Sequence, residues 1–264
     1  MSEDSPVRQT SCDCNTTWND LSNISTICEN FDIQEAHPNE RAFFFFGNSV
    51  NRHYAFALAN ALKNLPDELH SRGKEIGQCP KDSIKGCTLG NIKFLWKTWP
   101  LVPRNEAKWK LPPEHLLDGC EKFGSDIEKC FSEFLGSPTK KDVLIVGSNF
   151  AFTSIGEFSG NDYELIDAAK VDIPIYVTLL EKLFPGIIIF HTLCPLRNED
   201  DKQRWAIQLN EITRKAIEGT RIYLVDTFGY LFNKTHLYND HIHHPGILSE
   251  QIVRILMSIV KCSD

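Results

Sequence analysis

A run of four phenylalanines, Phe43 to Phe46, is the feature that most constrains the fold. Successive side chains of a strand point to opposite faces, so an unbroken apolar run predicts a strand buried on both faces, as in a parallel sheet covered by helices on each side. Gly47 ends the run, and apolar residues then recur at helical spacing between residues 54 and 65. The segment therefore predicts a strand, a tight turn and an amphipathic helix.

The same alternation continues to the end of the chain. Its apolar patterns predict strands at 91–96, 142–146, 186–190 and 221–225, and helices at 127–135, 173–184, 203–218 and 248–260. In the helix at 173–184, Pro174 is expected in the first turn, where a missing N–H is tolerated. Strands that alternate with helices predict an α/β fold: a three-layer α/β/α sandwich around a mostly parallel sheet of about five strands.

The domain organisation follows from where the periodic patterns begin. Residues 1–40 are rich in Ser, Thr, Asn, Asp and Cys and show no sustained period. We therefore expect an irregular segment packed on the body of the protein. Residues 41–264 are expected to form a single domain.

The charge balance and the apolar stretches bear on partners. The chain has 28 Lys and Arg against 35 Asp and Glu, a formal net charge of −7, which argues against a nucleic-acid partner held by a general basic field. The longest mostly apolar stretch, Phe184 to Leu196, is interrupted by two prolines and is shorter than the roughly 18 residues that cross a bilayer. No membrane span is expected, and the sequence leaves the oligomeric state open.

Cysteines and sequons bear on the compartment. The chain holds nine cysteines and three N-glycosylation sequons, at Asn15, Asn23 and Asn233. The polar start, Met1 to Thr10, has no apolar core of a signal peptide, so either the chain is cytoplasmic or a signal or anchor has been removed. The secretory lumen or the exterior is the favoured location, and the cytoplasm is the alternative.

Polar residues follow three of the expected strands. They lie at 47–52, 147–149 and 240–246, and they include a serine, an amide, a carboxylate and several imidazoles. In an α/β sheet the ligand site lies beyond the carboxyl ends of the strands. We therefore expect these side chains to converge on one edge of the sheet.

Three of these residues supply the parts of a serine nucleophile. Serine needs an imidazole to take its proton, and the imidazole works best when a carboxylate fixes its tautomer. Ser49, His243 and Asp240 are these parts, and a spacing of three lets the carboxylate and the imidazole share one turn. The backbone N–H of Ser49 and the side-chain amide of Asn149 are the expected donors to the oxyanion.

The arrangement resembles the SGNH (GDSL-type) hydrolases, and within them the PC-esterase and trichome-birefringence-like branch. Their blocks read G-D-S-x-x-R, G-x-N-D and D-x-x-H, and this chain departs from them at Asn48 and Phe150, which stand where Asp is usual. The matching residues are Gly47, Asn48, Ser49 and Arg52 for the first block, Gly147, Ser148, Asn149 and Phe150 for the next, and Asp240 and His243 for the last.

The resemblance implies a function. The branch contains esterases and O-acyltransferases that act on glycans, so it implies a serine esterase that hydrolyses O-acyl, above all O-acetyl, esters on a glycan or small polar substrate. No cofactor and no metal are implied, and Arg52 and Asn48 are the expected substrate-binding residues. One alternative is an O-acyltransferase that uses the same acyl-enzyme. The other is an inactive glycan- or acyl-binding module, which the departures at Asn48 and Phe150 make credible.

The same residues also have interpretations that involve no serine nucleophile. The serine at position 49 could only cap the following helix, and Asn149 could only bond its own backbone. A cluster of histidines around Asp240 could in principle bind zinc, although its spacing matches no common zinc motif. Cys194 is expected to be a buried packing residue.

Overall fold

The computed structural model describes residues 31–47, 49–62, 87–89, 91–96, 132, 135–147, 162–198, 200–240 and 242–263. Within these residues the sheet has six strands in the order β2-β3-β1-β4-β5-β6. Neighbouring strands from β3 to β6 are all parallel, and β2 runs antiparallel to β3 at the edge. The strands are β1 (Phe43–Gly47), β2 (Cys87–Leu89), β3 (Ile92–Trp96), β4 (Val143–Gly147), β5 (Ile187–His191) and β6 (Tyr223–Val225).

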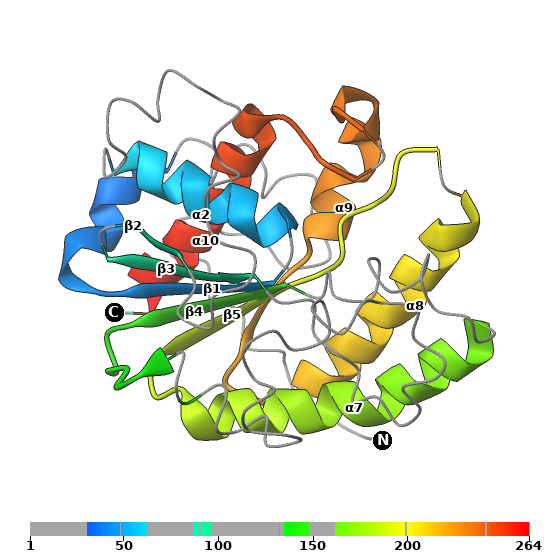
Figure 1. Ribbon diagram of the computed structural model, residues 1–264, viewed down its shortest axis with the longest axis horizontal. Helices are drawn as coiled ribbons and strands as arrows, with labels where there is room; N and C mark the ends of the chain where they lie inside the picture. Colours follow the sequence, from blue (N-terminus) through cyan, green and yellow to red (C-terminus); the bar gives the residue numbers. More distant parts are fainter. Residues whose placement is uncertain are drawn as a thin grey trace, which may run out of the picture.

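Helices cover both faces of this sheet (Figure 1). One face carries α2 (Ser49–Ala61) and α10 (Gly246–Cys262), and the other carries α7 (Asp162–Leu183) and α8 (Asp200–Ile217). The α/β fold with a mostly parallel sheet, predicted from the alternating patterns, is therefore confirmed. The short helices α9 (Thr227–Leu231) and η6 (Phe232–Leu237) follow β6 and lead back to the carboxyl edge of the sheet.

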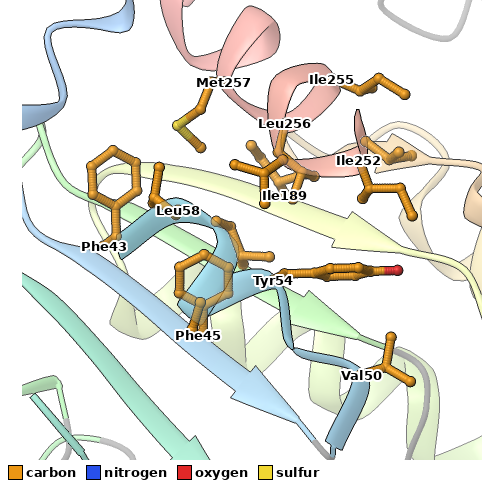
Figure 2. Close-up of a cluster of buried hydrophobic side chains, with 14 of the residues drawn as sticks. Phe43, Phe45, Val50, Tyr54, Leu58, Ile189, Ile252, Ile255, Leu256 and Met257 are labelled. Atoms are coloured by element: carbon orange, nitrogen blue, oxygen red, sulfur yellow. The ribbon is translucent and has the colours of Figure 1, made fainter. Parts of the chain in front are cut away.

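The phenylalanine run divides its side chains between the two layers, as a doubly covered strand requires. Phe43 and Phe45 are buried against α2 and α10, whereas Phe44 and Phe46 are buried in the separate cluster on the side of α7 and α8. Figure 2 shows the first cluster, in which the ring of Tyr54 joins the apolar side chains while its hydroxyl points away from Phe43 and Phe45. The run thus fixes the central strand between two cores.

Two expectations about the elements need correction, and one strand was not expected. The helix after β1 begins at Ser49 rather than at residue 54; Val50 is the one apolar residue of its first turn, so no apolar spacing marked this start. Pro174 lies inside α7, not in its first turn, and it is exposed, so water can reach the carbonyl group that its ring leaves unbonded. The edge strand β2 has only three residues and gave no periodic signal.

Residues 31–40 form two short 3₁₀ helices, η1 (Ile33–Ala36) and η2 (Pro38–Glu40). Arg254 of α10 donates a hydrogen bond to the Phe31 carbonyl at 2.6 Å, and Lys261 of the same helix bonds Glu35. This part of the N-terminal segment is therefore attached to the last helix. The earlier residues of that segment, and nearly all of the helix expected at 127–135, lie outside the described residues.

Candidate active site

Ser49 stands at the junction of the first strand and the first helix. β1 ends at Gly47 and α2 begins at Ser49, so the serine occupies the amino end of a helix at the carboxyl edge of the sheet. The first N–H groups of a helix have no partner within it and carry partial positive charge. The partial positive charge at this end of α2 would therefore favour a negative oxygen that develops beside the serine.

The hydroxyl of Ser49 meets the imidazole of His243. Its Oγ lies 2.7 Å from Nε2 of His243, and Nδ1 of the same ring lies 2.7 Å from Oδ2 of Asp240. A carboxylate can only accept, so Nδ1 carries the ring proton and Nε2 is left to accept the hydroxyl proton. The three side chains thus have the geometry of a nucleophile, its base and the group that orients the base.

The loop from Asn239 to His243 brings the carboxylate of Asp240 to the imidazole that follows it three residues later. Oδ1 of Asp240 accepts hydrogen bonds from the backbone N–H groups of Ile242, at 2.8 Å, and His243, at 2.7 Å. The N–H of Asn239 donates to the carbonyl of His243 at 2.8 Å and closes the loop. One carboxylate oxygen therefore shapes the backbone, and the other is turned toward the ring.

These contacts also set the charge of Asp240. Partial burial would raise the pKa of this carboxyl, but the hydrogen bonds from the backbone of His243 and Ile242, with the ring of His243, outweigh it and lower the pKa to about 2. Asp240 is therefore ionised wherever the neighbouring imidazole can act as a base. A charged partner for the imidazolium is permanently present.

His244 anchors the same loop in the core. Its Nε2 lies 3.2 Å from the hydroxyl of Tyr54, its Nδ1 lies 3.2 Å from Oγ of Ser249, and its ring stacks on that of Tyr54 with centroids 5.5 Å apart. Burial lowers the pKa of His244 to about 4, so the ring is neutral near pH 7. The two adjacent histidines therefore have different roles: His244 fixes the loop to the core, and His243 contacts the serine.

A second buried contact, between Asn51 and His191, ties the turn of Ser49 to the sheet. Asn51 donates from Nδ2 to the carbonyl of Phe46 at 2.8 Å, and its Oδ1 accepts from Nε2 of His191 at the end of β5. A Cβ at Gly147 would lie 2.5 Å from both of these polar atoms. The glycine that ends β4 is therefore required to leave room for this pair.

His53 lies one helical turn after Ser49 and covers one face of His243. The two imidazole rings stack with centroids 5.3 Å apart and planes 17° apart. Burial, aided by the nearby His243 and Arg52, lowers the pKa of His53 to about 4, although Asp240 opposes the shift. The ring of His53 that stacks on His243 is therefore uncharged near pH 7.

The structure brings together Ser49, His243 and Asp240, the three residues predicted to react. Arg52 lies in the same turn of α2, where it is half-buried and its burial lowers its pKa. Asn48, expected to bind substrate, and Asn149, expected to donate to the oxyanion, lie outside the described residues. Within the described ranges no group of three or more His, Cys, Asp and Glu side chains could hold a metal ion.

The sequence reasoning assigned no supporting role to four residues, His53, His244, Asn51 and His191, although Asn51 and His244 lie in the segments expected to converge at the edge of the sheet. The signal for His53 was available, because residues four apart share a helix face once the helix is known to begin at Ser49. His191 is the last residue of β5 and so lies at the edge where sites form. Cys194, expected as a packing residue, is buried, and its thiol lies 3.5 Å from the hydroxyl of Tyr54.

Comparison with known proteins gives no further assignment: no family model matches the chain, and no curated protein matches it. The function is therefore inferred from the residues of the site and their geometry. In the part of the chain that the structure describes, none of the helices has the length and apolar character needed to traverse a bilayer.

Proposed function

We propose that this protein is a serine esterase that cleaves O-acyl esters through an acyl-enzyme on Ser49. The observation that carries the proposal is the continuous chain of contacts from Ser49 through His243 to Asp240, with both links at 2.7 Å. A serine that only capped its helix would not need an imidazole on its hydroxyl, nor a carboxylate on the far nitrogen of that imidazole.

In the acylation step, Oγ of Ser49 forms a bond to the ester carbonyl carbon while its proton moves to Nε2 of His243. The carbonyl π electrons move to the oxygen, which the backbone N–H of Ser49 and the positive end of the α2 dipole can stabilise. The tetrahedral intermediate then breaks its bond to the alkoxy oxygen, which takes the proton from His243. The alcohol leaves and the acyl group remains on Ser49. Asp240 stays ionised throughout and stabilises the imidazolium.

Deacylation repeats these steps with water. His243 takes a proton from a water molecule whose oxygen bonds to the acyl carbon, and the collapse of the intermediate returns that proton to Ser49. The side chain of His243 is 29% exposed, so water and substrate can reach it. If a sugar hydroxyl replaced water here, the same intermediate would give an O-acyltransferase.

The substrate class proposed is an O-acyl, above all O-acetyl, ester of a glycan or a small polar molecule. Support comes from the resemblance of the three short blocks around Ser49, Asn149 and His243 to the SGNH hydrolases. We place the protein in the secretory lumen or outside the cell. Cys262, in the last turn of α10, is disulfide-bonded, and such bonds persist in oxidising compartments.

Covalent labelling with a fluorophosphonate tests the nucleophile without knowledge of the substrate. The full chain should acquire one label on Ser49, located by peptide mapping, and Ser49→Ala should lose it. The matched control is Ser137→Ala, which removes an exposed serine from a bend and should label like the wild type. A label on another residue, or none in a folded protein, contradicts the proposal.

Assays with acetylated sugars then identify the group that leaves and the molecule that accepts the acetyl group. Release of acetate that disappears in Ser49→Ala supports the esterase. Transfer of the acetyl group to an added sugar in preference to water identifies the transferase. If the protein binds acetylated sugars without turnover or label, it is a binding module and the proposal is wrong.

A further inference from the structure

The two hydrogen bonds on His243 hold its ring at the edge and leave its faces to other contacts. Both bonds lie at the ring nitrogens: Nδ1 donates to Asp240 and Nε2 accepts from Ser49. The Cβ–Cγ bond holds the ring at a third point, so its remaining motions are small torsions about the Cα–Cβ and Cβ–Cγ bonds. These torsions change the line of approach from Ser49 to Nε2, and a group that touches the face of the ring restricts them further.

His53 makes that contact. Its ring lies nearly parallel to that of His243, with 17° between the planes and 5.3 Å between centroids. It comes from α2, the helix that also carries Ser49, and the two residues are one turn apart. A single helix therefore supplies both the hydroxyl that His243 must reach and the flat surface against which the imidazole rests.

The charge state of the contact matters as much as its shape. The titratable groups that face His53 are Arg52 on its own helix, and Asp240, His243 and His244 on the loop. Burial, with smaller contributions from His243 and Arg52 and against the effect of Asp240, lowers the pKa of His53 to about 4, so its ring is neutral near pH 7. A neutral aromatic face next to an imidazolium is attractive, whereas a second cation would repel it.

We propose that His53 is a positioning residue for His243: its uncharged ring stacks on the imidazole and holds it at the tilt that points Nε2 toward Ser49. This inference rests on the proposed function for its consequence in catalysis. The ring contact itself can be measured separately.

The test compares two substitutions at position 53 that differ in whether they keep a flat ring. His53→Ala removes the stacking surface, and His53→Phe keeps it without any titratable nitrogen. With nitrophenyl acetate, His53→Ala should lower kcat by about tenfold to a hundredfold with little change in KM, since misplacement of a catalytic group by about 1 Å has effects of this size. His53→Phe should recover kcat to within about threefold of the wild type.

Asn60→Ala is the matched control, because Asn60 is an exposed residue of the same helix. It should leave kcat unchanged. Equal activity of His53→Ala and the wild type would overturn the proposal. So would a His53→Phe variant as impaired as His53→Ala, since that result assigns the role to a nitrogen of His53 rather than to its flat face.

A second measurement keeps the ring contact separate from the esterase proposal. In the NMR spectrum of histidine-labelled protein, the ring current of His53 should displace the chemical shifts of the carbon-bound ring protons of His243, and His53→Ala should remove that displacement while His53→Phe retains a ring-current shift. A shift that does not change overturns the inference even if Ser49 is labelled. A shift that changes in a protein that neither labels nor hydrolyses supports the contact and contradicts only the function.

Discussion

Asn51 and His191 share a buried hydrogen bond that joins the first turn of α2 to the end of β5. Both side chains are fully buried, and the same amide of Asn51 also donates to the carbonyl of Phe46 at the end of β1. The helix that carries Ser49 is thereby bonded to two strands of the sheet. The position of the serine depends on polar contacts beneath it as well as on the apolar core.

Asn51→Ala should destabilise the protein strongly. The change leaves the Phe46 carbonyl and Nε2 of His191 without this partner in a buried place, which costs about 2–4 kcal/mol in the free energy of unfolding. Denaturant unfolding measures this change, and Asn60→Ala on the exposed side of the helix should stay within about 0.5 kcal/mol of the wild type. Equal effects of the two substitutions would contradict the role of the Asn51 amide.

Gly147→Ala should also destabilise the protein. The added methyl group would lie 2.5 Å from Oδ1 of Asn51 and from Nε2 of His191, so these groups must separate, at a cost of about 1–3 kcal/mol. Gly246→Ala is the control, because a Cβ there meets nothing within 4 Å. If thermal unfolding shows the two variants to be equally stable, the site does not need a glycine at 147.

Asp240→Asn should lower kcat/KM by about a hundredfold to ten-thousandfold without unfolding the loop. Because Oδ1 accepts from two backbone N–H groups, the oxygen of the new amide will take that place and its NH₂ will face Nδ1 of His243. The ring must then accept at Nδ1 and carry its proton on Nε2, where it can no longer take the proton of Ser49. Ester hydrolysis and the rate of fluorophosphonate labelling should fall together. A variant with wild-type rates would contradict the assigned tautomer.

Stability should decline as the pH falls from about 6.5 to about 4. Burial lowers the pKa of both His191 and His244 from 6.5 to about 4, so in this window the unfolded chain binds protons that the folded chain does not. The free energy of unfolding then falls by up to about 1.4 kcal/mol per pH unit for each histidine. Denaturant titrations across this range measure the slope. A flat profile would mean that these rings are charged in the folded protein.

The sequence predicted the layers of the fold more fully than the surroundings of the site. The runs Phe43–Phe46 and the strands at β4 and β5 are apolar on both faces, and this pattern has few other interpretations. The start of α2 was placed too late because Val50 is the only apolar residue among 49–53, and one apolar residue sets no helical period. β2 was missed because a strand of three residues has no period to detect.

The reacting residues were predictable because each follows a strand or lies in a short spaced motif. The residues that support them were not, because their roles arise from contacts across the fold. The pair Asn51 and His191 is 140 residues apart in the chain, and the contact of Tyr54 with His244 spans 190. Polar residues of this kind show no spacing that distinguishes a buried partner from an exposed side chain.

Asp240 and His243 lie in one short loop, but the nucleophile, Ser49, lies 194 residues before His243 in the chain. The loop from 239 to 243 can form its own internal hydrogen bonds before the rest of the chain is organised, whereas Ser49 meets it only when the first and last helices are packed on the same face of the sheet. The reactivity of one hydroxyl would therefore report that this face of the sheet has assembled, and a fluorophosphonate added at timed intervals during refolding would measure how fast it does so.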